Sequence, residues 1–142
     1  MSGSRRTSTR SYVIDTYAWV EYLRGSRQGK DAQQFIEGKN AYTPSVVLAE
    51  LTKWYLRELE GRRRRQEEMT GHLSFVESAT VVVPLDGQLA REAGELDFAM
   101  KRRVKGWPLA DSIICATARS MRADVVSGDP HFRGLEGVVF LG

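Results

Sequence analysis

The 142-residue sequence has a single cysteine, Cys115, and only two histidines. One cysteine excludes an internal disulfide and any metal site built from several thiolates. A nearly cysteine-free chain is typical of a reducing compartment, so we expect a cytoplasmic protein. No apolar run is long enough to cross a bilayer, and residues 1–11 lack the apolar segment of a secretory signal. We therefore expect no association with membranes.

Basic residues are in small excess: the chain has 21 basic and 18 acidic residues, which gives a net charge of +3. This excess allows an anionic partner but does not by itself indicate one. Residues 1–11 are rich in serine, threonine and arginine, and we expect them to form a flexible basic tail. The remaining residues, 12–142, have a length that suits one domain around one core.

Strand and helix signals alternate along the chain, with no internal repeat. This order predicts an α/β fold with a central, mainly parallel sheet of about five strands flanked by helices. Short β-favouring runs predict strands at residues 12–14, 41–43, 81–83, 125–126 and 138–141. Helical spacing of apolar residues predicts helices at about 16–24, 32–36, 45–59, 69–76, 89–100 and 108–121. We expect Ser45 to cap the third of these helices.

Two aspartates follow predicted strands. Asp15 ends the apolar run Tyr12-Val13-Ile14, and Asp129 lies in the turn that follows Val125-Val126-Ser127-Gly128. In open parallel sheets, ligands bind beyond the carboxyl ends of the strands, where both residues fall. Taken alone, Asp129 is a common turn residue and is more often structural than functional.

Two further carboxylates lie on apolar helices. Glu50 has Val46, Val47 and Trp54 as helical neighbours, so its charge lies on or beside an apolar stripe. The alternative is an edge residue paired with a nearby base. Asp111 lies in the first turn of the most apolar helix, where acidic residues are also common because they complement the helix dipole.

Taken together, the four carboxylates favour a functional site over four separate structural roles. If they meet in one crevice, their charges repel each other strongly. A cation relieves that repulsion, and oxygen ligands without cysteine or histidine favour Mg²⁺ or Mn²⁺. Such an ion activates water and neutralises charge on a phosphoryl group. A basic exterior around this cleft suits the phosphodiester backbone of a nucleic acid.

Four segments in this order resemble the PIN-domain family, and within it the VapC-type toxins of toxin–antitoxin modules. The segments are Tyr12-Val13-Ile14-Asp15-Thr16, Ser45-Val46-Val47-Leu48-Ala49-Glu50, Pro108-Leu109-Ala110-Asp111-Ser112-Ile113-Ile114-Cys115-Ala116 and Val126-Ser127-Gly128-Asp129-Pro130-His131-Phe132. The resemblance spans nearly the whole chain and retains all four acidic positions. It does not include the basic N-terminal extension.

The resemblance implies an endoribonuclease that hydrolyses RNA with a water activated by Mg²⁺ or Mn²⁺. Asp15 and Asp111 would hold the principal ion, and Glu50 and Asp129 would complete the shell directly or through water. Thr16 and Ser127 match hydroxyl residues that support the site. The resemblance also implies a homodimer and inhibition by a cognate VapB-like antitoxin that inserts into the acidic groove.

Other residues carry weaker hypotheses. Two basic segments, Arg62-Arg63-Arg64-Arg65 and Lys101-Arg102-Arg103 with Lys105, are candidates for RNA contact, although charge runs are usually solvated faces. Trp19, Trp54 and Tyr55 are candidates for an apolar groove that holds an antitoxin helix or a second copy, or for core packing. We expect His131 to serve the turn or the substrate rather than a metal.

Two other functions compete with the nuclease. A non-catalytic PIN-like module would bind RNA or act as a scaffold without cleaving. A phosphoacceptor domain is disfavoured, because an aspartyl-phosphatase motif needs a second aspartate where Tyr17 stands, and a receiver needs adjacent acids after the first strand.

Overall fold

The computed structural model describes residues 10–62 and 64–142. The first nine residues of the predicted tail, and Arg63, lie outside the described residues. The first strand, β1 (Ser11–Ile14), begins one residue before the predicted domain boundary. Arg10, which precedes this strand, forms an ion pair of 3.2 Å with Asp124.

A five-stranded sheet forms the centre of the fold, with strand order β3-β2-β1-β4-β5 and every pair parallel. The other strands are β2 (Ala41–Pro44), β3 (Val81–Val83), β4 (Ala123–Ser127) and β5 (Val138–Phe140). The predicted α/β class is confirmed. The chain first builds outward from β1 to β3 and then returns to the other side of β1 with β4. This reversal creates a switch point between β1 and β4, where a parallel sheet opens a crevice at its carboxyl edge.

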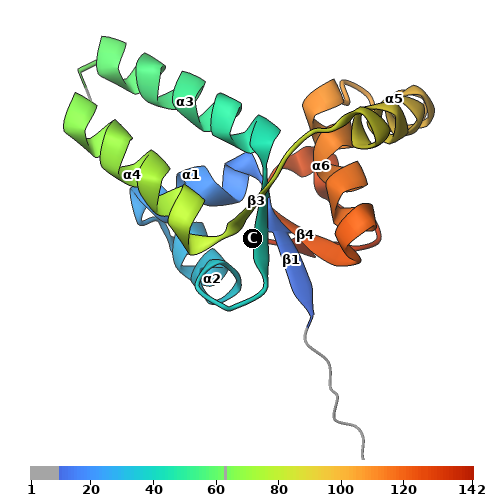
Figure 1. Cartoon of the computed structure of the whole chain (residues 1–142), viewed down its shortest axis with the longest axis horizontal. Coiled ribbons are helices and arrows are strands. Elements are labelled where there is room, and N and C mark those ends of the chain that lie inside the picture. Colours follow the sequence, from blue (N-terminus) through green and yellow to red (C-terminus); the bar gives the residue numbers. More distant parts are fainter. Residues whose placement is uncertain (1–9, 63) are drawn as a thin grey trace, which may run out of the picture.

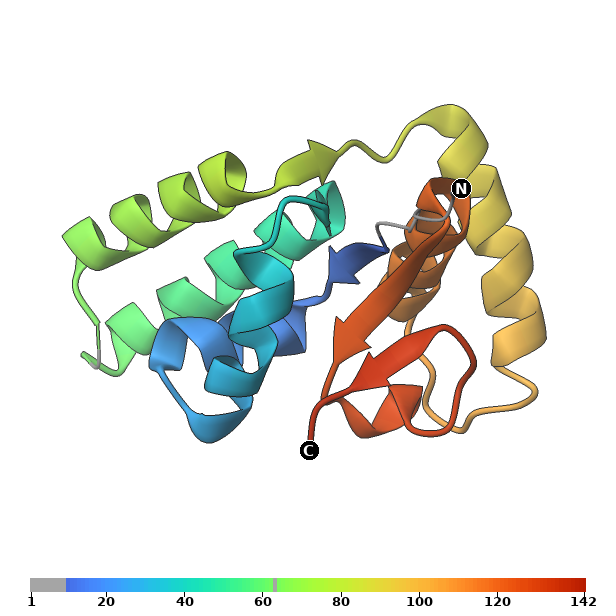
Figure 2. The ribbon, with the colours of Figure 1, turned by 90° about the horizontal axis from the view of Figure 1, so that it is seen from below.

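Six α-helices flank the sheet within the described residues. They are α1 (Thr16–Arg24), α2 (Arg27–Ile36), α3 (Ser45–Glu60), α4 (Gln66–Ala79), α5 (Gly87–Met100) and α6 (Leu109–Met121). The first four helices lie on one side of the molecule and α5 and α6 on the other (Figure 1). Figure 2 shows α3 and α4 as an antiparallel pair that extends away from the sheet. None of these helices has the length and apolarity that crossing a bilayer requires.

Local signals set most helix ends. The Asp15 carboxylate caps α1, and α1 ends at Gly25, whose φ of 70° favours glycine. Gly29 allows α2 to cross close to α1, because a Cβ there would lie 2.1 Å from the Glu21 carbonyl oxygen. The prediction that Ser45 caps α3 is wrong. Pro44 takes the cap position in an extended conformation, and the Ser45 hydroxyl instead accepts a hydrogen bond of 3.1 Å from the Leu85 backbone N–H.

Two of the three aromatics proposed for a surface groove belong to the core. Trp19 and Tyr55 have no exposed surface. The Trp19 indole N–H donates to the Thr43 hydroxyl at 3.1 Å, and the Tyr55 hydroxyl is hydrogen-bonded to His72. Burial of these large rings against the sheet and α4 stabilises the fold more than exposure to a partner would. Trp54 alone remains partly accessible.

Candidate functional site

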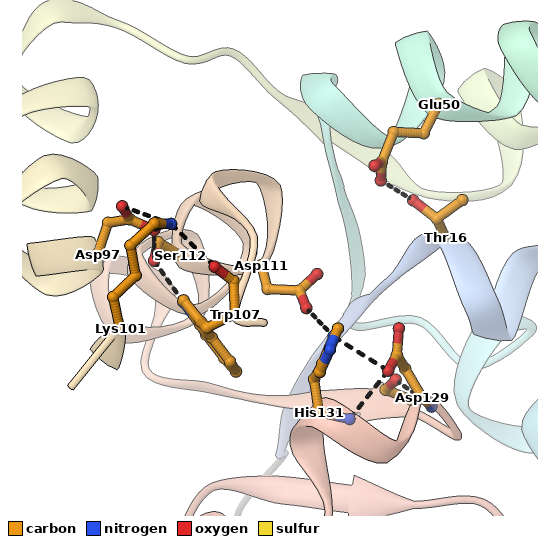
Figure 3. Close-up of polar contacts among 10 residues, drawn as sticks. Thr16, Glu50, Asp97, Lys101, Trp107, Asp111, Ser112, Asp129 and His131 are labelled. Atoms are coloured by element: carbon orange, nitrogen blue, oxygen red, sulfur yellow. Dashed lines mark hydrogen bonds and ion pairs between the residues drawn. The ribbon is translucent and has the colours of Figure 1, made fainter. Parts of the chain in front are cut away.

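The topology brings the two strand-end aspartates to neighbouring positions. Ile14 of β1 is in register with Val126 of β4, so Asp15 and Asp129 follow adjacent strands at the same edge of the sheet. Asp111 enters from the first turn of α6 and Glu50 from the second turn of α3. Figure 3 shows Glu50, Asp111 and Asp129 arranged around one space above this edge.

The Asp15 carboxylate is buried and hydrogen-bonded within the protein. It accepts a bond of 2.8 Å from the Ala18 backbone N–H and a second bond from the Ser127 hydroxyl. The Ser127 hydroxyl oxygen also accepts a bond of 3.0 Å from the Asp129 N–H. Ser127 thus connects the two strand ends.

Asp111, Asp129 and His131 form the tightest group of possible metal ligands in the described chain, with one donor atom of each within 4.8 Å of the others. The His131 Nδ1 atom lies 3.2 Å from Asp111 Oδ2 and 3.4 Å from Asp129 Oδ1 (Figure 3). The His131 backbone N–H also donates to Asp129 at 2.9 Å, because Pro130–Phe132 forms a short 3₁₀ turn. The sequence favoured a turn or substrate role for His131 and did not place its ring between two carboxylates.

Glu50 stands across the space from Asp111. Its carboxylate accepts a short hydrogen bond from the Thr16 hydroxyl, which follows Asp15 in the chain. Glu50 lies outside the tightest group, yet its charge contributes to raising the pKa of Asp111. Asp111 is therefore within electrostatic reach of Asp129 and Glu50, and Asp15 is within reach of Asp111 and Asp129.

Burial dominates the electrostatics of the site. It raises the pKa of Asp15 to about 8, against hydrogen bonds from Ser127 and Ala18 that lower it, and with repulsion from Asp111 and Asp129 that raises it further. Burial also raises the pKa of Asp111 to about 7, with added repulsion from Asp129 and Glu50 and a partial offset from His131. Asp15 therefore holds a proton at neutral pH, and Asp111 does so in part, unless a cation replaces these protons.

These residues fit a divalent cation. Oxygen ligands bind Mg²⁺ or Ca²⁺ at about 2.0–2.6 Å, so a group of donors within 4.8 Å can share one ion. Among the described residues, no lysine or arginine forms an ion pair with Asp15, Asp111 or Asp129, and only His131 compensates their charge. A buried acidic group that lacks basic partners is the electrostatic environment that hard cations stabilise.

A second polar network lies behind Asp111 and was not predicted. The buried Trp107 indole N–H donates to the Ser112 hydroxyl at 2.6 Å, and this hydroxyl donates to Asp97 at 2.9 Å. Lys101 donates both to Asp97, at 3.0 Å, and to the Trp107 carbonyl oxygen, at 2.8 Å (Figure 3). The network ties the α5–α6 connection to the residue that follows Asp111. Its members are scattered through ordinary helix and loop positions, so no sequence pattern marked them.

We expect Ser112→Ala to lower the free energy of unfolding by about 1–3 kcal/mol, because it leaves the buried Trp107 N–H without an acceptor. Urea unfolding measures the change. Ser120→Ala is the matched control on the same helix, since the hydroxyl of the exposed Ser120 donates to the Thr117 carbonyl oxygen of its own helix, and we expect it to stay within about 0.5 kcal/mol of the wild type. Equal stability of the two variants would contradict the role of the network.

The fold and the site together define an α/β domain with a group of carboxylates at the switch point of a parallel sheet. The PIN domain model matches residues 12–138, and the chain belongs to this family. Among curated proteins, none matches the sequence.

Solved structures resemble the chain over nearly its whole length. Mycobacterium tuberculosis VapC20, described as a sarcin-ricin loop cleaving toxin, superposes with a TM-score of 0.69 at 18% identity, over 93% of this chain and 100% of that one. VapBC2 from Rickettsia felis, bound to a promoter DNA fragment, superposes with a TM-score of 0.65 at 17% identity, over 91% of this chain and 96% of that one. A toxin–antitoxin complex from Klebsiella pneumoniae superposes with a TM-score of 0.62 at 22% identity, over 91% of this chain and 96% of that one. At this low identity the likeness concerns the fold.

Proposed function

We propose that the protein is a Mg²⁺- or Mn²⁺-dependent endoribonuclease that hydrolyses RNA phosphodiester bonds. The observation that carries this proposal is the buried group of carboxylates, with pKa values raised to about 8 for Asp15 and about 7 for Asp111 and no lysine or arginine paired with them among the described residues. Perturbed acids in a crevice at the edge of a sheet are typical of functional sites.

Each site residue has a role that its contacts support. Asp15 and Asp111 would hold the principal ion, with Asp129 in the same donor group as Asp111 and with His131 available as a nitrogen donor. Glu50 would complete the shell directly or through water, and the Thr16 hydroxyl orients its carboxylate. Ser127 keeps Asp15 and the Asp129 turn together. When bound, the ion would activate a water for attack on phosphorus and stabilise the charge that develops on the phosphoryl oxygens.

The biological setting is part of the same proposal. Membership of the PIN family and the likeness to VapC20 and VapBC2 support a toxin of a VapBC-type module, held inactive by a VapB-like antitoxin. A location in the cytoplasm and a homodimer complete the proposal as expectations from the sequence. The crevice at the switch point would then receive either an RNA strand or a segment of the antitoxin.

The basic segments proposed for RNA contact differ in their surroundings. Arg64 and Arg65 each pair with Glu68, and their turn lies at the end of the α3–α4 pair, away from the sheet (Figure 1). Lys101 is bound by Asp97 and a carbonyl oxygen. Arg102 lies over the ring of Phe98 at 4.5 Å. Contacts of RNA with Arg62, Arg63, Arg64 and Arg65 and with Lys101, Arg102, Arg103 and Lys105 stay predictions.

Purified protein, free of any antitoxin, tests the function. We expect it to cleave single-stranded RNA when Mn²⁺ or Mg²⁺ is added and to show no cleavage in EDTA, because the buried carboxylates need the cation. Gel analysis of labelled RNA measures this directly. Salt-sensitive binding without cleavage at any Mn²⁺ concentration would instead favour a non-catalytic RNA-binding or scaffold module.

A further inference from the structure

Beyond Glu50, one flank of α3 carries a row of cationic and aromatic side chains. Lys53, Trp54 and Arg57 follow Glu50 at spacings of three, four and seven residues, so all of them share its side of the helix. With a rise of 1.5 Å per residue, Trp54 lies about 6 Å and Arg57 about 10 Å further along the axis than Glu50. The row therefore leads away from the acidic crevice, along the helix that extends beyond the sheet (Figure 1).

The charges in this row are not used by the fold. Lys53 and Arg57 are exposed, and neither forms an ion pair among the described residues. Trp54 is half-buried, with its ring against Tyr55 at a centroid distance of 4.7 Å. The Arg64 guanidinium lies 5.7 Å from the Trp54 centroid and reaches it from the α3–α4 turn. Two unpaired cations, Lys53 and Arg57, therefore lie near a partly accessible indole, and Arg64, which also pairs with Glu68, adds a third.

Single-stranded nucleic acid fits this combination. Proteins that bind a single strand combine aromatic rings, on which bases stack, with cations that follow the phosphates. We propose that this α3 flank, formed by Lys53, Trp54, Arg57 and Arg64, is the track for single-stranded RNA beside the acidic site, with Trp54 stacking on one base. The inference rests on the proposed function and specifies where the substrate lies. A protein partner, the alternative for Trp54, is less well matched by these cations and becomes an outcome of the test.

The three tryptophans provide a sharp experiment. Trp19 is fully buried and Trp107 is 2% exposed, so an added ligand can reach Trp54 alone. We expect a single-stranded RNA oligonucleotide, added in EDTA to prevent cleavage, to quench the intrinsic fluorescence of the wild type. Trp54→Phe should lose most of this quenching while keeping affinity within about threefold, because a phenyl ring also stacks. Trp54→Ala should bind about tenfold more weakly.

Charge variants test the track without disturbing the core. Lys53→Gln and Arg57→Gln should each lower the slope of log affinity against log salt by about 0.7. Arg91→Gln, an exposed site on α5, is the matched control, and we expect its slope and affinity to equal those of the wild type. Unchanged slopes in both α3 variants, or RNA binding without quenching, would overturn the track.

The outcomes separate this inference from the proposed nuclease. Quenching and salt dependence as expected, without cleavage in Mn²⁺, would support the track and reject the enzyme. Cleavage with no effect of the Trp54, Lys53 and Arg57 variants on RNA affinity would support the enzyme and reject the track. Fluorescence of Trp54 that changes with protein concentration in the absence of RNA would assign the flank to a second copy of the chain and overturn the RNA track.

Discussion

Asp15→Asn should reduce Mn²⁺-dependent RNA cleavage by about 1,000-fold, since an ion in such a site supplies several kcal/mol of transition-state stabilisation. The asparagine removes the charge that helps to hold the ion and retains the local structure. Its side-chain oxygen can still accept the 2.8 Å bond from the Ala18 N–H that caps α1. Initial rates of RNA cleavage at saturating Mn²⁺ measure the loss, with circular dichroism as the check on folding.

Matched variants make this result specific. Asp111→Asn should show a loss of similar size, because Asp111 belongs to the tightest donor group. Glu77→Gln removes a carboxylate from the exposed surface of α4 and should leave the rate unchanged. Cleavage by both asparagine variants at the wild-type rate would reject the assignment of the acidic site.

The stability of the metal-free protein should fall as the pH rises from about 5 to 8, and Mn²⁺ should reverse this fall. The folded-state pKa values of Asp15 and Asp111 are raised above their ordinary value of 3.8. The folded protein therefore keeps protons that the unfolded chain has lost, and the stability that they provide is lost as the pH rises toward the folded pKa. For each proton retained, the free energy of unfolding falls by about 1.4 kcal/mol per pH unit. This corresponds to roughly 5 °C in melting temperature for a chain of this length.

Mn²⁺ replaces these protons, so its apparent affinity should increase with pH. At one hundred times its dissociation constant, the ion should raise the melting temperature by about 9 °C. Thermal melts of the wild type and Asp15→Asn across this range isolate the contribution of one carboxylate. The metal-free variant should melt higher than the wild type at pH 8 and gain less from Mn²⁺. A wild type whose stability is flat from pH 5 to 8, or whose Mn²⁺ response equals that of the variant, would contradict this electrostatic account.

Much of the fold was predictable because its signals are local. Apolar β-favouring runs such as Val81–Val83 and helical stripes such as that of α5 predicted the element types and the α/β class, which the structure confirms. Placement of Asp15 and Asp129 at strand ends also followed from local sequence. The error at Ser45 has a local cause, since the preceding proline is already extended and takes the cap position.

Other features depend on residues that are remote in sequence. The position of His131 between Asp111 and Asp129, and the bonds from Trp107 through Ser112 to Asp97, arise where separate segments pack together. The burial of Trp19 and Tyr55 is likewise a property of packing, because an aromatic stripe on a helix looks the same whether it meets the core or a partner.

The sequence by itself determined which carboxylates this protein places at strand ends and helix starts, because side-chain periodicity and turn chemistry act over a few residues. Only the tertiary structure decided that Asp111, Asp129 and His131 meet near the buried Asp15, without lysine or arginine partners for these aspartates among the described residues. The order of strands and the depth of burial set the distances between charges, and those distances decide how the acids titrate and what can bind there.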